Sequence, residues 1–132
     1  MTEEIRPDDI APPAANYAHA VLTESGRRWL HTSGVVPISP DGTTPSVLGE
    51  QAEVVWANIR AMLRDAGMGV DDVVSVTSYV VASDRLADDL RVVMAVRDRV
   101  LGGHRAASTL VTVPALARPE WAMEIAVVAA AG

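Results

Sequence analysis

Two strand-like segments of this 132-residue chain have no polar face, and this constrains the fold more than any other feature. Residues 73–81 and 121–129 are rich in Val, Ile, Ala and Met, and side chains alternate between the two faces of a strand. Alternate residues of 121–129 give two apolar faces, and those of 73–81 add only Ser, Thr and Tyr to Val. We therefore expect a sheet that helices cover on one side and another subunit covers on the other.

Two segments with helical periodicity flank the strand at 73–81. In the first, apolar residues fall at helical spacing over 52–66, and Gly67 follows where a helix C-cap needs a left-handed residue. The second begins after Ser83-Asp84, has a mostly apolar face over 86–101, and ends at Gly102-Gly103. Because crossovers between strands of one sheet are right-handed, we expect both helices on the same side of it.

The remaining segments predict further strands. Residues 17–23 and 27–33 are typical of a β-hairpin that turns at Ser25-Gly26, and residues 109–113 are typical of a strand that precedes 121–129. Residues 1–14 form a Pro-rich extended lead. The length fits one domain over residues 1–132, and the order ββαβαββ predicts a two-layer α+β fold.

Composition excludes several kinds of chemistry. The chain has no cysteine and every basic side chain is arginine, which excludes disulfides, thiolate nucleophiles and lysine Schiff bases. The formal net charge of -6 repels phosphate, so we expect no nucleic-acid partner. No apolar run approaches the roughly 20 residues that cross a bilayer, and the N-terminus lacks the basic start of a secretion signal. We expect no membrane association and a cytoplasmic location.

Glu124 is a lone carboxylate on an apolar face of the strand at 121–129. Removal from water disfavours its charged form, so Glu124 is a candidate acid, base or water-holding group. The alternative is that it reaches solvent at the strand end or pairs with an arginine. His19, His31 and His104 lack a spacing typical of metal ligands, and no phosphate-binding glycine motif is present, so we expect neither a metal nor a cofactor.

Several motifs together resemble the RidA/YjgF family of reactive-intermediate deaminases over nearly the whole chain. They are Tyr17 after the Pro-rich lead, His-Thr-Ser-Gly-Val-Val-Pro at 31–37, the first helix from Gln51, and the run from Ala107 through Arg118-Pro119 to Glu124. The resemblance implies a chorismate-mutase-like α+β fold, a homotrimer, and small-molecule sites in the clefts between subunits.

The resemblance also implies an activity. Active members of the family hydrolyse enamines and imines, such as 2-aminoacrylate, to 2-oxo acids and ammonia without a cofactor. By similarity, Glu124 matches the catalytic glutamate, and Tyr17, Ser33 and Gly34 match cleft-lining residues. Ser108 stands where these deaminases carry the arginine that binds the substrate carboxylate, and Met94 replaces a cleft asparagine.

Because Ser108 replaces this arginine, the sequence does not identify which residue binds the substrate carboxylate. Arg105 precedes Ser108 by three residues, which displaces it by roughly 10 Å along a strand, although a long side chain could return it to the cleft. We therefore expect Ser108, Thr109 and Arg105 to contribute to substrate binding. The alternative function is a noncatalytic trimeric module that binds or senses a small metabolite in the same cleft.

Overall fold

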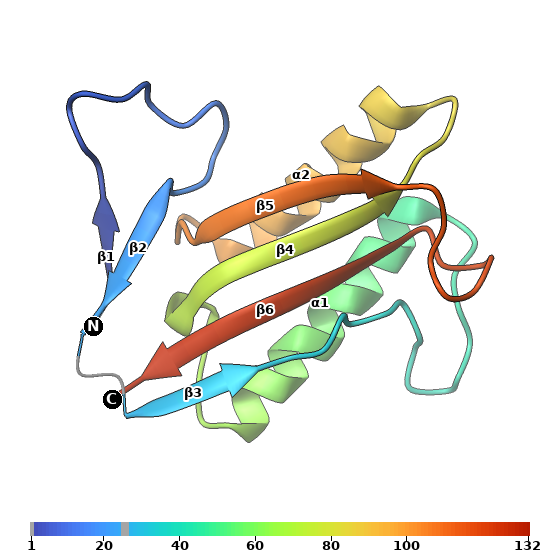
Figure 1. Cartoon of the computed structure of the whole chain (residues 1–132). Helices are drawn as coiled ribbons and strands as arrows, with labels where there is room; N and C mark the ends of the chain where they lie inside the picture. The colour runs from blue at the N-terminus through green and yellow to red at the C-terminus, as the bar shows by residue number, and fades with distance from the viewer. Residues whose placement is uncertain (1, 25–26) are drawn as a thin grey trace.

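A four-stranded mixed sheet forms the centre of the molecule. The computed structural model describes residues 2–24 and 27–132. The elements are β1 (Thr2–Ile5), β2 (Ala20–Thr23), β3 (Arg28–His31), α1 (Leu48–Asp65), the 3-10 turn η1 (Val70–Asp72), β4 (Val73–Val81), α2 (Leu86–Leu101), β5 (Ala107–Val113) and β6 (Met123–Ala131). The sheet order is β3-β6-β4-β5; β4 and β5 are parallel, whereas β6 is antiparallel to β3 and β4 (Figure 1). The predicted α+β architecture is confirmed.

Both helices lie on one side of this sheet, as predicted (Figure 1). The buried stripe of α1 has helical spacing and consists of Ala52, Val55, Trp56, Ile59 and Leu63. It packs against alternate residues of β6, namely Met123, Ile125, Val127 and Ala129, which are all fully buried. Gly67 (φ 70°) and Gly102 (φ 58°) follow α1 and α2 in the left-handed conformation that ends each helix.

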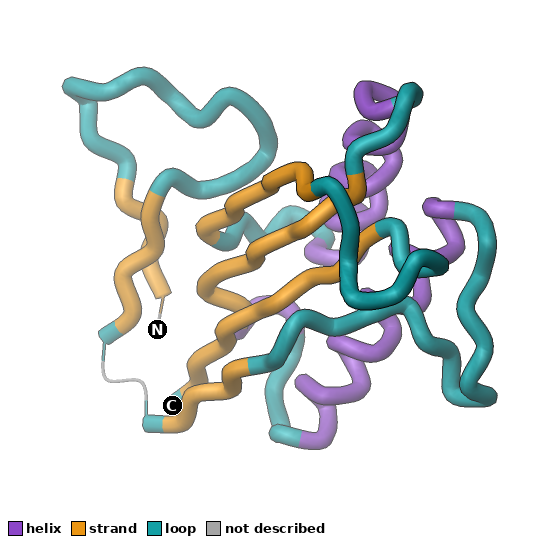
Figure 2. Tube along the Cα trace, turned by 45° about the vertical axis from the view of Figure 1, so that its right-hand side comes forward, coloured by secondary structure: helices purple, strands orange, loops and turns teal. Residues whose placement is uncertain are grey.

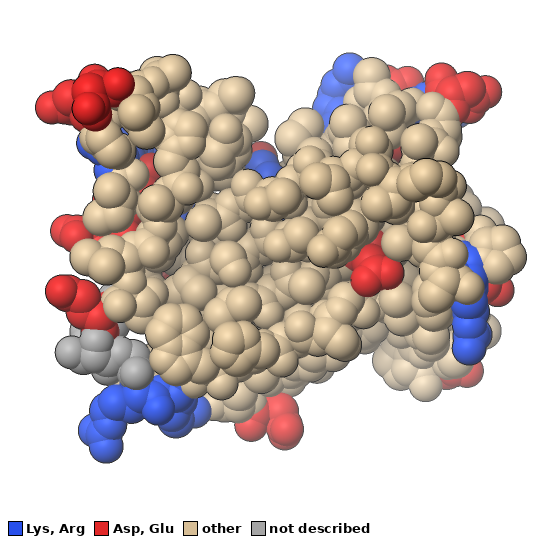
Figure 3. All heavy atoms as spheres, viewed as in Figure 1, with Lys and Arg blue, Asp and Glu red and all other residues tan. Residues whose placement is uncertain are grey.

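The opposite side of the sheet, which we call the open face, is apolar and uncovered. Its residues are Trp29, His31, Ser75, Thr77, Tyr79, Val81, Thr109, Val111, Glu124, Ala126 and Val128. Trp29 is 49% exposed and Val111 is 38% exposed. Figure 3 views this side and shows an almost uncharged surface over the sheet, with one acidic patch. The prediction that neither face of the central strands is polar is therefore confirmed.

The predicted hairpin between residues 17–23 and 27–33 is wrong. β2 pairs with β1 from the N-terminal lead, and β3 pairs with β6 at the far edge of the sheet. The lead thus contributes a strand, and the observed order has one more strand at its start than the predicted ββαβαββ. Residues 6–19 form a long loop between β1 and β2 (Figure 2), and its end returns to the central sheet, where Ala18 forms a parallel bridge with Ala107 of β5. Ser25 and Gly26, where the turn was predicted, lie outside the described residues.

Within the described part of the chain, no helix has the length and apolar character needed to cross a membrane.

Candidate functional site

The segment after β3 continues alongside β6 and carries two of the predicted site residues. The amide of Thr32 donates to β6 at 3.0 Å and that of Val35 at 2.7 Å. Between these bonds two residues, Ser33 and Gly34, stand opposite one residue, Ala126. Two residues opposite one is the pattern of a β-bulge, which bends the strand and changes the direction of a side chain, often next to a functional site.

The bulge brings the backbone of Gly34 against the carboxylate of Glu124. A Cβ atom at position 34 would lie 1.7 Å from Glu124 Oε2, so any residue other than glycine would displace that carboxylate. Glu124 is half-buried on the open face, where it pairs across the sheet with Tyr79. The structure therefore brings Gly34 and Glu124 together, with Ser33 beside Gly34 in the same bulge, and we call these three residues the Glu124 cluster.

Gln51, a residue whose position in α1 was noted only for its family resemblance, orients the start of β6. It is 2% exposed; its Nε2 donates to the carbonyls of Pro45 (2.8 Å) and Glu120 (2.9 Å), and its Oε1 accepts from Ala122 N (2.9 Å). Ala122 precedes Glu124 by two residues, so the side-chain amide of Gln51 holds in place the backbone that positions the Glu124 carboxylate. The signal in the sequence is a glutamine four residues before Val55 on an otherwise apolar stripe.

A second group of predicted residues surrounds a cavity of about 240 Å³, which we call the Ser108 cavity. Its lining residues are Ala15, Tyr17, Met94, Arg97, Ser108 and Leu110. Arg97 of α2 was not predicted as a site residue, yet its NH1 donates to Ser108 Oγ at 3.2 Å. The sequence signal is an arginine four residues after Val93 on the buried face of α2.

The Ser108 cavity and the Glu124 cluster lie on opposite faces of the sheet. Ser108 pairs with Val76, whose side chain is buried under the helices, whereas Glu124 pairs with Tyr79 on the open face. Thr109 is exposed on the open face, away from the Ser108 cavity. One copy of the chain therefore does not join the two groups.

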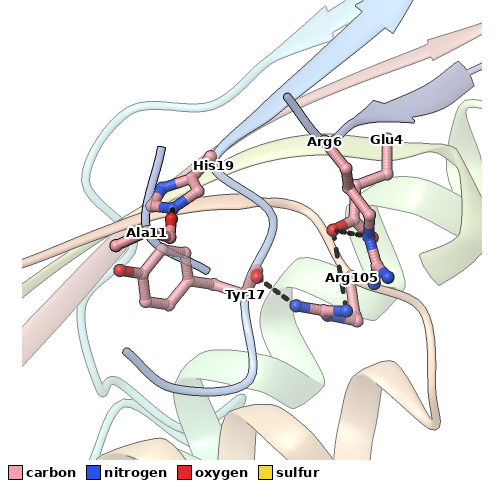
Figure 4. A network of polar contacts seen from close by, with 6 residues as sticks. All are labelled: Glu4, Arg6, Ala11, Tyr17, His19 and Arg105. Carbon is pink, nitrogen blue, oxygen red and sulfur yellow. Dashed lines mark hydrogen bonds and ion pairs between the residues drawn. The ribbon is translucent and has the colours of Figure 1, made fainter. Parts of the chain in front are cut away.

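Arg105 does not line the Ser108 cavity. Its NH2 donates to the carbonyl of Tyr17 at 2.6 Å, and its NH1 lies 3.6 Å from Glu4 Oε2 on β1 (Figure 4). The side chain lines a different cavity, of about 430 Å³, between the loop after β1 and the start of β5. Arg6 also bonds Glu4 (2.7 Å), and this bond, with a smaller Coulombic contribution from Arg105, holds the pKa of Glu4 below its ordinary value. Arg105 thus ties the N-terminal strands to the sheet.

The three histidines lie in separate places. Nε2 of His19 bonds Ala11 O at 2.8 Å (Figure 4), His31 stacks on Trp29, and Nε2 of His104 bonds Val73 O at 2.6 Å. Across residues 2–24 and 27–132, no three potential ligands of His, Cys, Asp or Glu type gather into a metal-binding group.

Comparison with known proteins gives a consistent result. Residues 9–131 match the family described as Endoribonuclease L-PSP. The structure is similar to that of the conserved Rid-family protein YyfB from Yersinia pestis, with 30% identity, 98% of each chain covered and a TM-score of 0.85.

Two further crystal structures are similar. A candidate endoribonuclease from Thermotoga maritima has 28% identity and a TM-score of 0.70, with 100% of this chain and 99% of that chain covered. The YjgF protein of E. coli has 23% identity and a TM-score of 0.69, with 97% and 98% covered. No curated protein shows significant sequence similarity to the chain.

Proposed function

Because the chain belongs to the RidA/YjgF family, the family described as Endoribonuclease L-PSP, we propose that it is a cofactor-independent deaminase of small enamines and imines. The observation that carries the proposal is the position of the Glu124 carboxylate. It lies on an apolar sheet face and against Gly34, where the carboxylate occupies the space that any larger side chain would need. A carboxylate in such a place can accept a proton from water.

The reaction balances without a cofactor. Glu124 takes a proton from a water molecule as the water oxygen attacks the carbon of a C=N bond. Glu124 returns this proton to the nitrogen, which gives a neutral carbinolamine. The carbinolamine hydroxyl then loses its proton to Glu124 and forms the C=O bond as the C–N bond breaks, and Glu124 passes that proton to the departing nitrogen, which leaves as ammonia. The products are a carbonyl compound and ammonia, and an enamine enters the same path after tautomerising to the imine.

We place this reaction at an interface between copies of the chain. The Glu124 cluster and the Ser108 cavity lie on opposite faces of one sheet, so a complete site needs the Ser108 cavity of one copy beside the Glu124 cluster of another. The open face supports such an assembly, because Trp29 and Val111 leave large apolar surface in water. By family resemblance, the assembly is a homotrimer.

Cleavage of RNA, which the family description names, has less support. The net charge of -6 repels a phosphate backbone, and the sheet face that carries Glu124 is almost uncharged (Figure 3). We therefore propose a small-molecule substrate.

A noncatalytic binding module is the second candidate. The observation in its favour is that Ser108 stands where similar deaminases carry arginine, while Arg105 is occupied by Glu4 and the carbonyl of Tyr17. Such a module would bind a small metabolite in the same interface without converting it.

The test is release of 2-oxobutanoate and ammonia from freshly generated 2-iminobutanoate. We expect turnover by the native chain and a loss of about 100-fold or more in kcat for Glu124→Gln, because the variant cannot take a proton from water. Glu120→Gln, which alters an exposed carboxylate four residues earlier, serves as the matched control and should keep full activity.

Two outcomes would contradict the proposal. Unchanged kcat in Glu124→Gln would remove Glu124 from the chemistry. Saturable binding of 2-oxobutanoate without any turnover of the imine, in a folded oligomer, would favour the binding module.

A further inference from the structure

The Ser108 cavity contains a buried positive charge that comes from a helix and not from the strand. Arg97 is 5% exposed and extends from α2 to β5, where NH1 reaches Ser108 Oγ. A buried guanidinium is costly unless each edge of it is satisfied. The partners of its three nitrogens therefore indicate what the group can still bind.

One edge of the Arg97 guanidinium is fully used. Nε and NH2 bond Asp98 Oδ1 at 3.0 and 2.9 Å, and NH2 lies 3.4 Å from the carbonyl of Asn16. NH1 carries two protons and, among the described residues, donates only to Ser108. The NH1 side thus faces the cavity with hydrogen-bonding capacity left.

Ser108 adds a second donor beside NH1. Its hydroxyl oxygen accepts from Arg97, so the hydroxyl proton remains to be donated elsewhere. Two donors next to each other, one of them charged, match the two oxygens of a carboxylate. A serine at this position is also small enough to leave the space that the guanidinium occupies.

The rest of the cavity is less polar. Tyr17, Met94 and Leu110 are half-buried around it and offer mainly apolar surface. From these contacts we propose that Arg97 and Ser108 together form a carboxylate-binding site, and that its ligand is a small monocarboxylate with a short apolar tail. This proposal concerns only how the carboxylate of the ligand is bound. It depends on the proposed deaminase function for the reaction that follows, but not for the binding itself.

The experiment measures binding, with 2-oxobutanoate and its uncharged amide as probes. The native chain should bind the acid at least tenfold more tightly than the amide. Arg97→Gln should weaken binding of the acid by about 30-fold or more, because the ligand charge would then be buried without a partner, and should leave binding of the amide unchanged. Arg91→Gln, which removes an exposed arginine of the same helix outside the cavity, should leave both affinities unchanged.

A double variant tests the chemistry in reverse. Adding Ser108→Arg to Arg97→Gln returns a guanidinium to the cavity from the strand and should restore preference for the acid. If Arg97→Gln does not fold, the native chain provides the readout. The NMR signal of Arg97 Nε–H should shift on addition of the acid and not of the amide, whereas that of the exposed Arg91 should not shift.

Three results would overturn the inference: equal affinity of the native chain for acid and amide, no binding of the acid at millimolar concentration, or unchanged acid affinity in folded Arg97→Gln. None of these bears on Glu124. Conversely, carboxylate-selective binding without turnover would overturn the proposed deaminase and leave the role of Arg97 intact.

Discussion

Gly34 is the residue on which the position of the Glu124 carboxylate, the proposed proton acceptor, most depends. Because a Cβ at this position would lie 1.7 Å from Glu124 Oε2, Gly34→Ala must push that carboxylate aside. A displacement of about 1 Å can cost 100-fold in rate, so we expect kcat to fall by about that factor. The end of a glutamate is flexible, so the free energy of unfolding should change by less than about 1 kcal/mol. Steady-state kinetics and urea unfolding measure the two effects.

Gly69→Ala is the matched control for this prediction. Gly69 has a φ of -131°, which any residue adopts, and a Cβ there meets nothing within 4 Å. This variant should keep both activity and stability. Full activity in Gly34→Ala would show that Glu124 does not need its observed position.

The sequence predicted individual residues well only where their neighbours along the chain decide their surroundings. Glu124 stands out because the strand around it is apolar, and the structure places Gly34 beside it. Arg105 and Arg97 could not be assigned in this way. Arg105 is held by Glu4, which lies far away in the sequence, and Arg97 reaches Ser108 only because α2 packs over β5.

At the scale of elements, Glu4 and Arg105 join β1 to the segment before β5, and this attachment of the β1–β2 sheet should respond to pH. The Arg6 bond, and the nearby Arg105, lower the pKa of Glu4 from its ordinary 4.5. A carboxyl whose pKa is lower in the folded chain stabilises it above the unfolded pKa and loses that effect as the pH falls through the folded value. Amide hydrogen exchange, corrected for intrinsic rates, should therefore accelerate in β1 and β2 between about pH 6 and pH 3.5.

Glu4→Gln should abolish this pH dependence, because the cluster then lacks the titrating group. Glu3→Gln changes an exposed carboxylate on the same strand and should retain the dependence. The same acceleration in both variants would show that another group controls this attachment.

The elements themselves differ in how far the sequence determines them. Strand 73–81 was predicted with its observed bounds, and α2 with its observed length, because hydrophobic period and glycine stops act locally. The predicted hairpin was wrong because strands pair with partners that can lie far away in the sequence. β3 gains four paired residues from the long β6, and residues 2–5, hidden before a Pro-rich stretch, supply the partner for β2.

At the scale of the whole molecule, the apolar character of both faces of β4 and β6 indicates a further partner for the sheet. Helices cover one face, and the described chain offers nothing to cover the other. Ser108 and Glu124 lie on opposite faces because successive side chains of a strand point to alternate sides of the sheet. The periodicity alone could therefore predict an uncovered face, but not which residues two copies would bring together.

Ala126→Arg tests whether the open face holds copies of the chain together. Ala126 is half-buried between Glu124 and Val128 on this face, and an arginine there would place a large charged side chain in any interface between sheets. Light scattering should give a mass of about three times 14.0 kDa for the native chain and 14.0 kDa for the variant, with loss of imine hydrolysis. Circular dichroism should be unchanged, because the side chain points away from the core.

The control adds the same charge elsewhere. Ala61 is exposed on α1, so Ala61→Arg should remain oligomeric and active. If the native chain is a monomer that still hydrolyses imines, the site is complete in one copy and the division between the Ser108 cavity and the Glu124 cluster has no catalytic meaning. If Ala126→Arg becomes a monomer while Ala61→Arg does not, the open face assembles the protein.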